Sequence, residues 1–231
     1  MENTTRKVWD LPVRIFHWSL LAAVIGAYLT NRLGVTYFRY HVWCGYAVLV
    51  LVCFRILWGL LGTRHARFRH FLRGPLTTAR YGAGLLRGSA AHMAGHNPLG
   101  ALMVVLLLAM LLTQAVTGLF GNDEIFNFGP LYGYVSNARS LALTSLHRRL
   151  FYWILAAIAL HVMAVAYHRY VKGERLVVAM WHGRKPAALV PDGEEIRSSR
   201  LWLAVLLVAV LCAVLAWVVH RAPVPVADPF N

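Results

Sequence analysis

Residues 147–167 read HRRLFYWILAAIALHVMAVAY, and this stretch decides the fold class. From residue 150 onward it holds no Asp, Glu, Lys or Arg, and its one strongly polar side chain is His161. A helix needs about 20 apolar residues to cross the hydrocarbon core of a bilayer. The stretch therefore predicts a transmembrane helix that carries a histidine inside the membrane.

The chain contains four more apolar runs, at residues 15–30, 42–61, 99–120 and 201–219. Of the 231 residues, 59% are hydrophobic and 14% are charged, against about 45–50% and 25% in soluble domains. The mean hydropathy is +0.56. These values exclude a cytosolic enzyme and a disordered chain. We expect an all-α integral membrane protein of five spans, and no signal-peptide cleavage pattern precedes the first.

The Lys and Arg residues predict the orientation. Sixteen lie in the N-terminal tail, the loop after the second run and the segment after the fourth, whereas six lie on the opposite side and Arg55 lies inside a run. The more basic side of a membrane protein is cytoplasmic. We therefore expect a multi-pass protein of the bacterial inner membrane, with a cytoplasmic N-terminus and a periplasmic C-terminus. The net charge of +14 then reflects topology, so lipid is a partner and nucleic acid is not.

Four of the 11 histidines lie at the ends of, or within, the apolar runs: His17, His41, His147 and His161. His147 and His161 are fourteen residues apart, which returns to nearly the same helix face about 21 Å along the axis. At matching depths, His41 pairs with His147 and His17 pairs with His161. The remaining seven are expected to be exposed or interfacial: His65, His70, His92, His96, His168, His182 and His220.

Two stacked histidine pairs inside a helix bundle indicate two b-type haems, each with two axial histidines. No CxxCH motif occurs, which excludes covalent c-type haem attachment. A proton relay or a path for a transition metal is the alternative interpretation of such a stripe. None of the five runs contains Asp or Glu, which argues considerably against the interpretation as a transporter.

Five further residues are candidates for cofactor binding. Arg55 shares a helix face with His41 and is either the partner of a haem propionate or a side chain that snorkels to the interface. Gly45 follows His41 by one turn, where the missing side chain lets a macrocycle approach the backbone. Arg14, Arg148 and Arg149 flank ligand histidines and either hold propionates or act only as topology signals.

At these residues the sequence resembles the family of bacterial cytochrome b561 and the nickel–iron hydrogenase cytochrome b subunit. The resemblance covers about residues 8–180. The matching stretches are VWDLPVRIFHW (8–18), His41 with Gly45, FRILWG (54–59), GHNPLG (95–100), TGLF (117–120), and His147 followed by His161.

The resemblance implies a four-helix bundle with haem ligands at His17, His41, His147 and His161. It also implies electron transfer between the membrane quinone pool and a periplasmic redox protein, such as a hydrogenase, another reductase or cytochrome c. A stand-alone oxidoreductase that reacts with superoxide or quinone is the alternative. We expect a dihaem domain at residues 1–180, a cytoplasmic linker at 181–200, and a fifth transmembrane helix with a periplasmic tail at 201–231.

Overall fold

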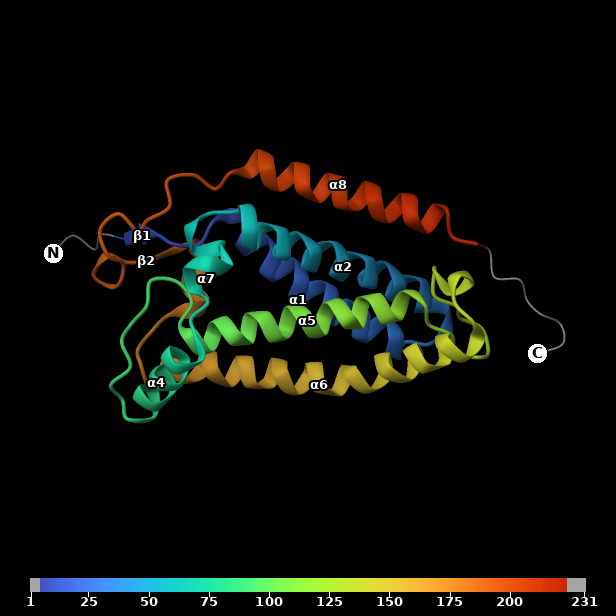
Figure 1. Cartoon of the computed structure of the whole chain (residues 1–231), viewed down its shortest axis with the longest axis horizontal. Coiled ribbons are helices and arrows are strands. Elements are labelled where there is room, and N and C mark those ends of the chain that lie inside the picture. The colour runs from blue at the N-terminus through green and yellow to red at the C-terminus, as the bar shows by residue number, and fades with distance from the viewer. Residues whose placement is uncertain (1–4, 224–231) are drawn as a thin grey trace. The chain divides into compact units, whose positions relative to one another are not determined.

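The computed structural model describes residues 5–223, and five long helices dominate them (Figure 1). All five are long and apolar enough to cross a membrane. This confirms the all-α membrane fold class predicted from the sequence. The five helices are α1 (Leu11–Arg32), α2 (Phe38–Leu61), α5 (Pro98–Leu119), α6 (Asn137–Tyr170) and α8 (Leu201–His220).

Shorter elements connect these helices. The short α-helices are α3 (Phe68–Phe71), α4 (Pro75–Leu86) and α7 (Leu176–His182). The 3-10 helices are η1 (Val35–Tyr37), η2 (Arg64–Ala66), η3 (Tyr132–Tyr134) and η4 (Ala187–Leu189). The strands β1 (Thr5–Lys7) and β2 (Arg184–Pro186) form one antiparallel pair, in which Arg6 is opposite Lys185.

The described residues divide into two compact units. The first unit comprises residues 5–17, 55–108 and 157–204, and the second comprises residues 18–54, 109–156 and 205–223. Each of the five long helices contributes residues to both units.

The first unit is built around the residues that precede α1. Val8 and Trp58 are fully buried, and the backbone N–H of Val8 donates to the oxygen of Gly183. The backbone N–H of Ile196 donates to the oxygen of Lys7, so the segment after α7 packs against the N-terminal strand. Gly183 ends α7 with a φ of 80°, a conformation that favours glycine, and a Cβ there would lie 2.7 Å from a backbone oxygen.

Side-chain caps fix where two of the long helices begin. The Asp10 carboxylate accepts the N–H of Val13 at 2.7 Å and so caps α1. The Asn97 side chain accepts the N–H of Gly100 at 2.7 Å and caps α5, which starts with a proline. Asp and Asn are favoured caps because their oxygens satisfy N–H groups that have no partner within the helix.

In the second unit, α6 begins at Asn137, well before the apolar run expected from residue 150. Its first three turns are too polar to be found by hydropathy. They are held because Ser140 Oγ donates to the Phe120 oxygen, and Thr144 Oγ accepts the backbone N–H of Asn122. Hydropathy alone therefore leaves this segment outside the expected span.

α8 exposes apolar side chains along its whole length. Trp202 near its start and Trp217 near its end are 73% and 61% exposed, and Val205 and Val210 between them are also exposed. Such a helix is stable only where hydrocarbon covers it, and tryptophans near both ends are typical of the two membrane interfaces. Most of the tail expected after α8 lies outside the described residues.

Candidate functional site

In the second unit, His41 of α2 lies against His147 of α6, with 6.2 Å between ring centres and 80° between ring planes. The Nδ1 atom of His41 is 2.8 Å from the backbone oxygen of Ala27, and that of His147 is 2.9 Å from the oxygen of Gln114. Because a carbonyl oxygen only accepts, each Nδ1 carries a proton and donates it. In the neutral ring, Nε2 then keeps a lone pair, which is the form that binds a metal ion.

Glycines shape the space around this pair. A Cβ at Gly118 of α5 would lie 2.9 Å from Cε1 of His147, so only glycine lets the α5 backbone approach this ring. A Cβ at Gly45, one turn after His41 on α2, would meet no atom within 4 Å. α5 therefore packs directly against the His147 ring, whereas the space beside Gly45 is open to a ligand.

In the first unit, His17 of α1 lies against His161 of α6, with 6.4 Å between ring centres and 50° between ring planes. Both side chains are half-buried. α6 thus supplies one ring to each pair, from positions fourteen residues apart that share a helix face.

The ring spacing in both pairs fits a metal ion held between two imidazoles. A histidine nitrogen binds a metal at about 2 Å, so two rings on opposite sides of one ion have centres about 6.3 Å apart. Among residues 5–223, no group of three or more His, Cys, Asp and Glu side chains is arranged to hold a metal ion. A haem iron takes four ligands from its macrocycle and needs only two from protein.

Arg55 of α2 is almost completely buried, with 2% of its surface exposed, so it does not snorkel. Its Nη1 donates to the oxygen of Ala66 at 3.1 Å, and its guanidinium lies 5.4 Å from the ring centre of Phe68. The attracting anion is Asp10, which the sequence analysis missed because it considered only carboxylates within the spans. Asp10 precedes α1 and accepts hydrogen bonds from Trp58 and Thr63.

His96 lies in the first unit and packs against two aromatic rings, those of Trp9 and Phe71, each 4.7 Å away between centres. Its Nδ1 is buried. Burial, with Arg55 and Lys185 adding repulsion, lowers the pKa of His96 to about 3, so the ring is neutral near pH 7. His96 is thus half-buried against aromatic rings and is not the exposed side chain of a loop.

The three other candidate arginines have different surroundings. Arg14 donates from Nε to the Met180 oxygen at 3.2 Å and from Nη2 to the Trp181 oxygen, which places it at the end of α7. Arg148 and Arg149 on α6 are exposed.

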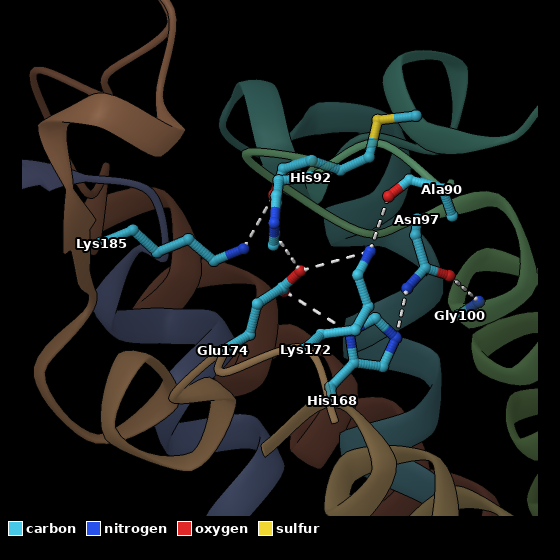
Figure 2. A network of polar contacts seen from close by, with 9 residues as sticks. Ala90, His92, Asn97, Gly100, His168, Lys172, Glu174 and Lys185 are labelled. Atoms are coloured by element: carbon cyan, nitrogen blue, oxygen red, sulfur yellow. Dashed lines mark hydrogen bonds and ion pairs between the residues drawn. The ribbon is translucent and has the colours of Figure 1, made fainter. Parts of the chain in front are cut away.

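A buried polar network centred on Glu174 lies in the first unit (Figure 2). Its carboxylate is 2.6 Å from Nδ1 of His92, 3.5 Å from Nδ1 of His168 and 3.7 Å from Nζ of Lys172. Burial alone would raise the pKa of Glu174, but hydrogen bonds from His168 and His92 outweigh it and hold that pKa at about 2. The network joins the segment before α5 to the end of α6.

Two further histidines of the first unit are buried, contrary to expectation. His168 and His65 were expected to be exposed or interfacial, but they are 6% and 7% exposed. Asn97 Nδ2 lies 3.2 Å from Nε2 of His168, and Nε2 of His65 lies 2.7 Å from the Glu194 oxygen. Both histidines therefore have protein partners, which is the physical reason they can be buried.

Comparison with known protein families finds a match over the part of the chain that contains the paired histidines. The family model of prokaryotic cytochrome b561 matches residues 8–183. No curated protein matches the chain. The matched range contains all four of the paired histidines, together with Gly45 and Arg55.

Proposed function

Because the chain belongs to the prokaryotic cytochrome b561 family, we propose that it is a dihaem cytochrome that carries electrons across the membrane. Membership confirms the resemblance found in the sequence. The chemistry of this family is membrane electron transfer by b-type haem. The number of haems, their ligands and the partners are our proposal.

The haem ligands in this proposal are His41 with His147 in the second unit and His17 with His161 in the first. The observation that carries it is the ring geometry: both pairs have the spacing of two imidazoles on one iron. When bound, each haem would supply a one-electron couple at its iron.

The protein's own groups set the properties of the second pair. The carbonyls of Ala27 and Gln114 accept the Nδ1 protons, which fixes the tautomer, orients each ring and makes its Nε2 a stronger donor. Gly118 admits the His147 ring, and Gly45 gives the macrocycle access to α2. Arg148 and Arg149 are the candidates for its propionates.

The first pair has a different polar environment, because buried Arg55 lies in the same unit. A buried cation favours the form of a nearby redox centre that carries more negative charge, and the reduced form is that form. We therefore propose that Arg55 holds a propionate and raises the midpoint potential of the first-unit haem.

The distribution of charge supports the direction of insertion. Seventeen of the 23 Lys and Arg residues belong to the first unit and six to the second. By the positive-inside rule, this distribution supports a cytoplasmic N-terminus and a periplasmic C-terminus. We propose that electrons pass between the membrane quinone pool and a periplasmic redox protein, such as a hydrogenase or cytochrome c.

The deciding experiment is a pyridine haemochrome assay of the purified full-length chain. We expect two non-covalent b-type haems per chain. His41→Ala and His147→Ala should each remove the same haem, and His17→Ala should remove the other. A well-folded wild type with one haem or none would refute the proposal.

Two exposed histidines provide the matched controls, since His182→Ala and His220→Ala change the same residue type outside both pairs. Both should keep two haems. If His17→Ala and His147→Ala were to lose the same haem in redox titrations, the proposed pairing would be wrong. Reduction of the protein by added quinol tests the quinone link separately.

A further inference from the structure

Buried polar atoms without a hydrogen-bond partner among residues 5–223 include Nη2 of Arg55 and Nδ1 of His96, both in the first unit. A buried donor that stays unpaired costs free energy, and nearly all such groups in folded proteins have a partner. A ligand with acceptor oxygens would satisfy Nη2 of Arg55 and, in the tautomer that carries its proton on Nδ1, the His96 ring as well.

Both residues lie beside the ring of Phe71. The Phe71 ring centre lies 5.9 Å from the guanidinium carbon of Arg55 and 4.7 Å from the ring centre of His96. Arg55 and His161 also lie close enough to His96 to disfavour its protonated form. One side chain comes from α2 and the other from the segment before α5, so the fold brings them together beside a proposed haem ligand.

No carboxylate of the described chain supplies the missing acceptor. Asp10 attracts Arg55, but it lies outside ion-pair distance, and its oxygens already accept from Val13, Trp58 and Thr63. A positive guanidinium and a neutral imidazole together match one carboxylate, which carries a single negative charge and accepts at two oxygens.

We propose that Arg55 and His96 together bind one carboxylate, a propionate of the haem held by His17 and His161. This inference rests on the proposed function, and it adds His96 as the second residue of a built anion site. Arg55 supplies the charge, and the Nδ1–H of His96 fixes the second oxygen and so the rotation of the macrocycle.

The test is a parallel redox titration of the holoprotein and its variants. Arg55→Leu and His96→Leu should each lower the midpoint potential of the first-unit haem, because the unpaired carboxylate stabilises the ferric form. For Arg55→Leu, the ratio of reduced to oxidised haem at fixed potential should fall about tenfold to a hundredfold, the range for charge-assisted hydrogen bonds. His96→Leu should give a smaller fall, and the second-unit haem should not change.

Conservative variants separate binding from packing. Arg55→Lys and His96→Asn keep a donor in place and should recover part of the lost potential, whereas the double Leu variant should fall by less than the two single effects combined. Arg87→Leu and His182→Leu, both at exposed positions of the first unit, are the controls.

A second measurement removes the carboxylate instead of the protein groups. The full-length chain, stripped of haem, is reconstituted with haem or with its dimethyl ester. Wild type should bind the ester more weakly at the first-unit site, and the double Leu variant should not distinguish the two. Unchanged potentials with two bound haems, or equal binding of both compounds by wild type, would overturn this inference while leaving the proposed function intact. A wild type that binds no haem would instead overturn the proposed function.

Discussion

Replacing Gly45 with alanine should have opposite effects on the protein with and without haem. Gly45 lies inside α2, one turn after His41, and a Cβ there would meet no protein atom within 4 Å. The apoprotein therefore tolerates the methyl group, whereas a macrocycle ligated by His41 would have to pack against it.

The two contributions differ in sign. Glycine inside a helix is about 0.8–1 kcal/mol less favourable than alanine, so Gly45→Ala should stabilise the apoprotein by about this amount. A methyl group forced into an occupied space costs about 1–3 kcal/mol. At about 1.4 kcal/mol per factor of ten, the affinity for the second-unit haem should fall about fivefold to 150-fold.

The assay combines thermal unfolding of the haem-free chain with haem titration, followed by redox titration to identify the affected haem. Gly82→Ala in α4 is the matched control, since a Cβ there has its nearest contact at 3.9 Å from Leu99. That variant should gain similar helix stability and keep both haem affinities. Tight haem binding by Gly45→Ala at both sites would mean that no macrocycle lies beside Gly45.

Three further changes test other features of the structure. Asp10→Ala removes the buried acceptor of Trp58 and Thr63, so thermal unfolding should show a loss of about 2–5 kcal/mol; an unchanged melting temperature would contradict this role. The pKa of Glu174 is lowered to about 2, so its contribution, at most about 3 kcal/mol, is present above its ordinary pKa and is lost as the pH falls from about 4.5 towards 2. Glu174→Gln should flatten acid unfolding in that range, and an identical acid profile would argue against it. An alkaline phosphatase fused after α8 should be active, because five spans and the proposed cytoplasmic N-terminus would put this end in the periplasm; activity of a cytoplasmic reporter there instead would contradict the proposed topology.

The sequence predicts the five spans well because hydropathy over about 20 residues measures the property that the bilayer selects. Hydropathy does not detect the start of α6, because Ser140 and Thr144 are polar. The structure gives both hydroxyls hydrogen-bond partners, which allows the helix to form there. Helix periodicity predicts that His147 and His161 share one face of α6, because residues fourteen positions apart lie on nearly the same face of a straight helix.

Hydropathy and helix periodicity could not predict the polar contacts of the first unit. Contacts between His92 and Glu174 join residues 82 positions apart, and the burial of His96 depends on where a loop without periodicity folds back. Asp10 was overlooked because it precedes its helix by one position, although its role as a cap was readable from the sequence.

The acceptors for His41 and His147 are main-chain carbonyls, those of Ala27 and Gln114. Substitution of either residue leaves a carbonyl in the same place as long as the helix persists. The hydrogen bonds to His41 and His147 should therefore persist when residues 27 and 114 are substituted. A genetic screen for altered redox behaviour should recover few replacements at these two positions. Such a screen should instead find changes that displace the backbone, such as prolines one turn away in α1 or α5.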